Sequence, residues 1–67
     1  MKPYVIHLQS QREPIFVELD CDSVDQLAEL ATQTRFLIGH LVEVDEQGCH
    51  ARVMISAGRI SCAFEVN

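Results

Sequence analysis

Hydrophobic residues recur at helical spacing in one stretch of the chain, Asp22–Arg35. Apolar residues that follow the i, i+3, i+4, i+7 spacing share one helix face: Val24, Leu27, Ala28 and Ala31, with Leu30 beside them. Ahead of this stripe, Ser23 and Gln26 have the spacing of a capping box, in which each side chain satisfies a free backbone N–H group. The pattern predicts one amphipathic helix over Val24–Gln33.

The rest of the chain alternates apolar and polar residues, which is the period of β-strands. Five segments show this alternation and are predicted as strands: Tyr4–Leu8, Ile15–Leu19, Phe36–Val44, Cys49–Ser56 and Arg59–Val66. With the helix they follow the order ββαβββ. At 67 residues the chain is long enough for one domain. We therefore predict an α+β fold, a single small domain over residues 1–67 in which the helix packs on a five-stranded, mostly antiparallel sheet.

Alternation also assigns side chains to the two faces of the predicted sheet. We expect the face covered by the helix to carry Ile6, Val17, Ile38, Val53, Cys62 and Phe64. The opposite face would then be only partly polar, because several apolar side chains fall on it: Val5, Phe16, Leu37, Leu41, Met54 and Ala63. The one predicted helix cannot cover both faces, so this second face is expected to be open.

Exposed apolar side chains on a sheet face usually mark an interface or a binding groove. We predict an interface formed by Phe16, Leu37, Leu41 and Met54, with a symmetric homodimer as its simplest form. Pairing of open strand edges is a second route to self-association. Two other interpretations stay open: the sheet curls into a partial barrel, or one strand is misassigned by one residue, which exchanges its faces.

Charge narrows the choice of partners. The chain has ten acidic and five basic residues, a net charge of −5, and its cations are scattered along the sequence. Direct binding to nucleic acid is therefore not expected. Acidic residues in the segment 20–29 leave open a different role, an inhibitor that occupies the nucleic-acid site of a partner protein. The same residues are also explained by the helix dipole, which favours acids near a helix N-terminus. No apolar run approaches the roughly 20 residues of a membrane helix.

The three cysteines are irregularly spaced, which argues against a disulfide framework and for reduced thiols in the cytoplasm. Cys49 and His50 are adjacent and so point to opposite faces of a strand, and no C-x-x-C or H-x-x-x-H spacing predicts a metal site. Cys21 precedes the predicted helix, where the dipole can favour a thiolate, so a reactive thiol is an alternative to a half-buried strand residue. His40 is either a pH-sensitive contact or a hydrogen-bonded residue at the core edge.

Motifs of catalysis are missing from the sequence. It contains no nucleophile elbow, phosphate-binding glycine loop or H-E-x-x-H, so we expect neither an enzyme nor a cofactor. The sequence predicts a small cytoplasmic protein-interaction or regulatory module that acts through an apolar sheet face or a strand edge. The alternatives are the acidic inhibitor described above and a small-ligand binder with a cavity under a curled sheet.

Overall fold

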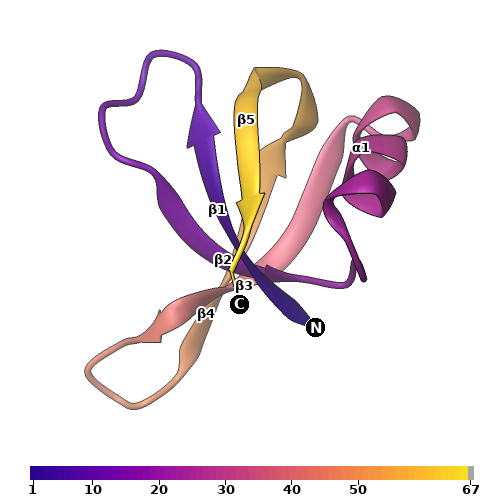
Figure 1. Cartoon of the computed structure of the whole chain (residues 1–67). Helices are drawn as coiled ribbons and strands as arrows, with labels where there is room; N and C mark the ends of the chain where they lie inside the picture. The colour runs from indigo at the N-terminus through magenta and orange to yellow at the C-terminus, as the bar shows by residue number, and fades with distance from the viewer. Residues whose placement is uncertain (67) are drawn as a thin grey trace.

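The two periodicities of the sequence produce the elements expected from them, in the order ββαβββ (Figure 1). In the computed structural model, which describes residues 1–66, the strands are β1 (Lys2–Leu8), β2 (Ile15–Leu19), β3 (Phe36–Val44), β4 (His50–Ser56) and β5 (Ile60–Glu65). The helix α1 spans Val24–Gln33, and a short 3-10 turn, η1 (Ala57–Arg59), joins β4 to β5. The predicted α+β fold is confirmed.

All neighbouring strands are antiparallel, in the order β4-β3-β2-β1-β5. The segment that contains α1 therefore joins two adjacent antiparallel strands, β2 and β3, and β5 returns to lie beside β1. This arrangement leaves β4 and β5 as the two edges of the sheet. The β3–β4 hairpin extends beyond the other strands at the lower left of Figure 1.

The inner face of the sheet encloses one apolar core. Buried residues from four strands, α1, η1 and the β2–α1 connection form it: Tyr4, Ile6, Val17, Leu19, Cys21, Leu27, Leu37, Ile55 and Ala57. The helix contributes Leu27 and packs against β5 and η1. The expected inner positions of β1, β2 and β4 are confirmed, since Ile6 and Val17 are fully buried and Ile55 is 2% exposed.

The faces expected for β3 are reversed. Leu37 is 2% exposed and lies in the core, whereas Ile38 is 57% exposed on the other side. Apolar residues occupy both faces of β3, so alternation alone could not choose between them. Gly39 lies very close to β2 on the core side of β3. A Cβ atom at this position would lie 2.3 Å from the Glu18 carbonyl oxygen and 2.7 Å from Leu19 Cδ2. The glycine thus lets the buried Leu19 side chain pack across β3.

The faces expected for most of β5 are also reversed, because of a β-bulge. His7 pairs with Cys62 and the next residue, Leu8, pairs with Ile60, so Ser61 is an extra residue on β5. A bulge of this kind shifts the alternation by one residue. Ile60 and Ala63 are therefore both partly buried against the core, whereas Phe64 is 55% exposed. The inward positions expected for Cys62 and Phe64 are wrong.

Local and tertiary hydrogen bonds together define the start of α1. Ser23 is the N-cap, and its Oγ accepts a 3.3 Å hydrogen bond from the Gln26 backbone N–H. The Gln26 side chain accepts from Asp22 N at 2.5 Å, one residue earlier than in the expected capping box. Val24 N–H donates to Glu65 Oε2 at 3.1 Å, so a carboxylate from the end of β5 satisfies another group of the first turn. Within residues 1–66, no helix has the length and apolar character needed to cross a membrane.

Candidate interaction surface

The face of the sheet turned away from the core is called the outer face here. It is formed by alternate residues of all five strands: Val5, His7, Phe16, Glu18, Phe36, Ile38, His40, Val42, Arg52, Met54, Cys62 and Phe64. Apolar residues predominate on it, and most of them are more than one-third exposed. The helix cannot cover this face, because it packs at β5 and η1 and places Leu27 in the core.

One apolar row crosses the outer face over four strands. Val5 lies opposite Phe16 on one side and opposite Phe64 on the other. On β3, Val42 follows Leu41, the partner of Val17, so it continues the row beside Phe16. Phe16 is 47% and Phe64 55% exposed, although the His7 ring packs edge-on against Phe64 at 5.8 Å between centroids. The row is thus a continuous apolar strip in which Phe16, Val42 and Phe64 are exposed and Val5 is half-buried.

A second apolar area lies where β3 pairs with β4. Ile38 is directly opposite Met54, and these side chains are 57% and 64% exposed. Phe36, two residues before Ile38 on the same face, is 50% exposed. Cross-strand apolar pairs stabilise a sheet, but a pair as open as this keeps most of its surface in water. The area is therefore available for contact with another molecule.

A polar row separates the two apolar areas. Glu18 pairs with His40, and His40 pairs with Arg52, so an acid, an imidazole and a base lie side by side on β2, β3 and β4. The His40 side chain is half-buried on the outer face, which corrects its expected position beside the core. The outer face therefore combines apolar contact area with charges of both signs, a composition typical of interfaces that form and dissociate.

The structure places the predicted interface residues in different environments. Phe16 and Met54 lie on the outer face, but in separate apolar areas. Leu37 is a core residue, and Leu41 is half-buried on the inner side and packs against the core. Leu37 and Leu41 lie on the inner side because the two faces of β3 are the reverse of those predicted. The other apolar side chains of β3 therefore lie on the outer face. Ile38, Val42 and Phe64 are exposed on the outer face but do not belong to the predicted set, and only the alternative alternation of β3 and β5 indicates them.

Two of the shallow cavities next to the core differ in their linings. One of about 260 Å³ lies beside the β1–β2 loop and is lined by Glu13, Pro14, Ile15, Phe16, Leu41 and Glu43. The other, about 180 Å³, lies between α1 and β5 and has only apolar side chains around it: Val24, Leu27, Ala28, Ala31, Ile60 and Ala63. The second cavity thus lies where α1 packs against β5, the strand that carries the bulge.

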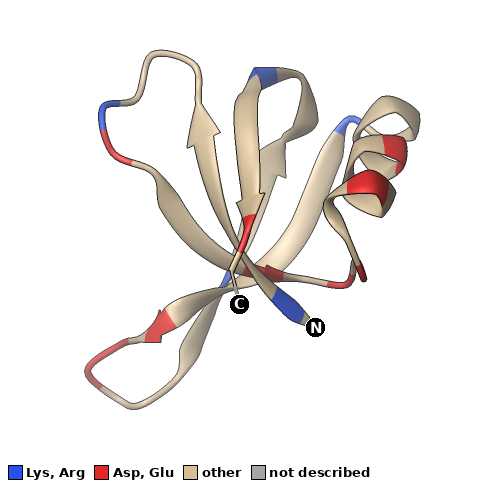
Figure 2. Cartoon of the chain, viewed as in Figure 1, with Lys and Arg blue, Asp and Glu red and all other residues tan. Residues whose placement is uncertain are grey.

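Charges are distributed unevenly over the molecule (Figure 2). The tip of the β3–β4 hairpin carries Glu43, Asp45 and Glu46, and a second acidic group follows β2 and continues onto α1. Arg35 and Arg59 lie at the opposite end of the β3–β4 pair, where Ala57 N–H donates to the Arg35 carbonyl at 2.9 Å. The molecule therefore has an acidic hairpin tip and a basic opposite end.

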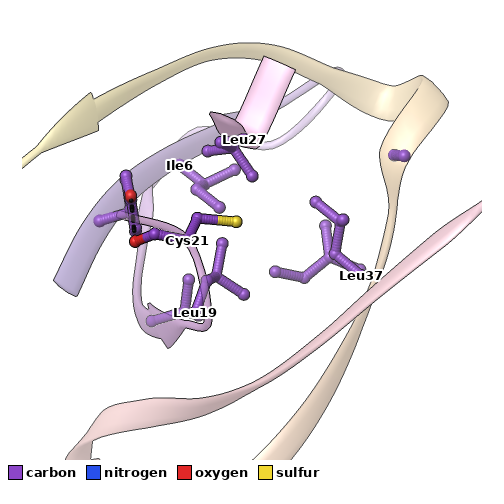
Figure 3. Packing of buried hydrophobic residues seen from close by; sticks show 9 residues of the cluster. Ile6, Leu19, Cys21, Leu27 and Leu37 are labelled. Atoms are coloured by element: carbon purple, nitrogen blue, oxygen red, sulfur yellow. Dashed lines mark hydrogen bonds between the residues drawn. The ribbon is translucent and has the colours of Figure 1, made fainter. Parts of the chain in front are cut away.

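Cys21 is enclosed by core residues. Its side chain points between Ile6, Leu19, Leu27 and Leu37, and it is 3% exposed (Figure 3). Burial raises the pKa of this thiol above its ordinary value, and the carboxylates of Asp20 and Asp22 raise the pKa further. Both effects disfavour the thiolate form of Cys21, which argues against a reactive thiol at this position.

The remaining cysteines and histidines do not assemble into a metal centre. Cys49 and Cys62 are exposed and unpaired thiols. Within the described part of the chain, no group of three or more His, Cys, Asp or Glu side chains is placed to hold an ion. His50 instead contacts the backbone, with Nδ1 2.9 Å from the Leu41 carbonyl oxygen at the irregular part of β3.

Comparisons of the chain with protein-family models, curated proteins and solved structures find no match. Any proposal about function therefore depends on the geometry described above. The feature with the clearest functional meaning is the exposed apolar surface of the outer face.

Proposed function

We propose that this protein is a small protein-interaction module that binds through the outer face of its sheet and associates with a second copy of itself. The observation that carries the proposal is the apolar strip over β5, β1, β2 and β3, extended by the exposed pair Ile38 and Met54. Large contiguous apolar patches are uncommon on monomers that have no partner. The polar row Glu18–His40–Arg52 would fix the orientation of a bound partner, since the partner must place complementary charges opposite this row.

Substitutions on the outer face test this proposal. Phe16→Glu and Ile38→Glu each place a charge in one apolar area, and Gln33→Glu at the exposed C-terminal end of α1 adds the same charge away from the outer face. We expect all three variants to keep the far-UV circular dichroism of the native protein. The outer-face variants should lose association that Gln33→Glu retains, as measured by light scattering over a range of concentrations and by capture of partner proteins. Equal behaviour of all three variants would contradict the proposal.

Salt separates this function from the acidic-inhibitor alternative. A complex held by the acids of residues 20–29 should weaken sharply as ionic strength rises, because exposed charges are screened beyond about 10 Å at 0.1 M salt. An apolar contact should weaken much less. The same association measured at low and high salt therefore assigns the binding surface to the outer face or to the acidic segment.

A second candidate function is the binding of a small apolar ligand between α1 and β5. It is favoured by the purely apolar lining of the 180 Å³ cavity at this place. A ligand that binds there should raise the unfolding temperature in proportion to the logarithm of its concentration. Ala28→Leu, which fills the cavity from the helix side, should abolish that rise, whereas Ala51→Leu on the exposed part of β4 should not.

A further inference from the structure

One edge of the sheet lacks a covering element. Strand β4 pairs with β3 on one side and, among residues 1–66, with no strand on the other. The opposite edge, β5, is packed against α1. Seven residues long, β4 contains neither proline nor lysine, the residues that commonly protect edges. Arg52 is the one residue of β4 with a permanent charge, so an edge of this length has little protection against pairing with another strand.

The backbone hydrogen bonds show which residues of β4 face the open edge. Ala57 N–H donates to the Arg35 carbonyl and the Cys49 carbonyl accepts from Asp45 N–H, so the odd-numbered residues that flank β4 at its two ends turn these polar groups toward the β3 side. Backbone groups in an antiparallel pair alternate in direction along the strand. The even-numbered residues therefore direct their N–H and C=O groups to the open edge: His50, Arg52, Met54 and Ser56.

Charge along this edge is arranged so that two antiparallel copies complement each other. The acidic hairpin tip precedes β4, and Arg35 and Arg59 lie at its other end (Figure 2). When two β4 strands run antiparallel, the tip of each copy lies beside the basic end of the other. Parallel pairing would bring the two acidic tips together.

We propose that β4 pairs antiparallel with β4 of a second copy, with Val53 on the two-fold axis. This inference rests on the proposed function and names both the partner and the contact. The register pairs Arg52 with Met54 and His50 with Ser56 of the second copy, so every outward-facing residue of β4 takes part. Placing Arg52 on the axis instead would bring two guanidinium groups side by side. The resulting sheet is continuous across both copies, and it joins the two Ile38–Met54 areas into one outer face.

A proline variant tests the edge hydrogen bonds. Met54→Pro removes an N–H group that does not bond to β3, and proline is tolerated at such edge positions. Met54→Ala removes the same side chain and keeps the N–H. We expect Met54→Pro to dimerise at least tenfold more weakly than Met54→Ala, with unchanged circular dichroism, because the two variants differ in the backbone N–H group and not in the loss of the methionine side chain. Dimerisation of Met54→Pro as tight as that of Met54→Ala, or a wild type that stays monomeric at all concentrations, would overturn the inference.

A charge exchange tests the orientation without relying on a backbone change. From a net charge of −5, Arg59→Glu gives −7 and Glu46→Arg gives −3, and the double variant returns to −5. If the acidic tip contacts the basic end of the second copy, each single variant weakens the dimer and the double variant restores it. General repulsion between acidic molecules predicts instead that Glu46→Arg tightens the dimer. That result would reject the proposed orientation.

A cysteine placed on the axis tests the register. With Cys49 and Cys62 replaced by Ser, Val53→Cys should oxidise to a covalent dimer, since the Cα atoms of a directly opposed pair are separated by about 4.5 Å, within the range of a disulfide. Ser61→Cys on β5 in the same background is the control and should remain monomeric under the same conditions. Equal cross-linking of the two variants would contradict the register.

The two proposals fail differently. If the dimer survives Met54→Pro and the charge variants but is lost in Phe16→Glu or Ile38→Glu, the edge inference is wrong and the outer face remains the contact. If Met54→Pro abolishes the dimer while Phe16→Glu and Ile38→Glu retain every association, the edge inference holds and the outer-face function is wrong.

Discussion

The Tyr4 hydroxyl lies 2.8 Å from the backbone carbonyl oxygen of Cys21 and donates a hydrogen bond to it inside the core. Tyr4 is fully buried on β1, and Cys21 belongs to the connection between β2 and α1. The bond therefore ties a central strand to the chain that leads into the only α-helix of residues 1–66. It also satisfies two polar groups in an otherwise apolar environment, as buried polar groups require.

Replacement of Tyr4 should show how much this hydrogen bond contributes to the free energy of unfolding. Tyr4→Phe keeps the ring but leaves the Cys21 carbonyl without its partner, and an unsatisfied buried group costs about 1–3 kcal/mol. We expect a decrease of that size in the free energy of unfolding, measured with urea. Phe64→Leu, at an exposed aromatic position, is the control and should change stability by less than about 0.5 kcal/mol. Equal stability of Tyr4→Phe and wild type would show that water replaces the hydroxyl.

The thiols should differ in reactivity according to burial. Cys49 and Cys62 are exposed, whereas Cys21 is enclosed in the core. In native protein we expect a thiol reagent to modify Cys49 and Cys62 rapidly and Cys21 only after unfolding. The variant with Cys49 and Cys62 replaced by Ser isolates the third thiol. Modification of that variant at the rate of a free thiol would contradict the buried position of Cys21.

Stability should fall at alkaline pH. Burial raises the pKa of the Cys21 thiol and that of the Tyr4 phenol, so the folded protein retains these protons at a pH where the unfolded chain releases them. The associated stability is present below the ordinary pKa values, 9.0 for Cys and 10.0 for Tyr, and is lost as pH rises above them. Urea unfolding between neutral and alkaline pH measures the slope. Cys21→Ala should reduce it in the lower part of this range, and an unchanged slope would show that other groups cause it.

Gly39 should not accept a side chain. A Cβ atom there would meet the Glu18 backbone at 2.3 Å, a distance that requires β2 and β3 to separate. We expect Gly39→Ala to lower the free energy of unfolding by at least about 1–3 kcal/mol, the usual cost of overpacking. Gly58→Ala is the matched control, because its Cβ would have no neighbour within 4 Å. Equal effects of the two substitutions would mean that the β2–β3 contact is looser than the structure shows.

Local pattern was sufficient to predict the elements. The helix begins and ends at the predicted residues, Val24 and Gln33. Its two signals, the helical spacing of apolar residues and the N-cap Ser23, are both local features of the sequence. The strands follow from alternation, and in β1, β2 and β4 the apolar residues of one face also identify the core side. In these strands the opposite face carries enough polar residues that only one face can be the core side.

Tertiary structure decided which residues form the candidate site. In β3 both faces are apolar, so the core side depends on Gly39, whose missing side chain makes room for Leu19 from the neighbouring strand. In β5 the bulge at Ser61 follows from the pairing with β1 and sends Phe64 outward. Strand order is likewise set by contacts between distant segments. Periodicity within a segment determines its secondary structure, but the direction of each face depends on neighbours that the segment itself does not encode.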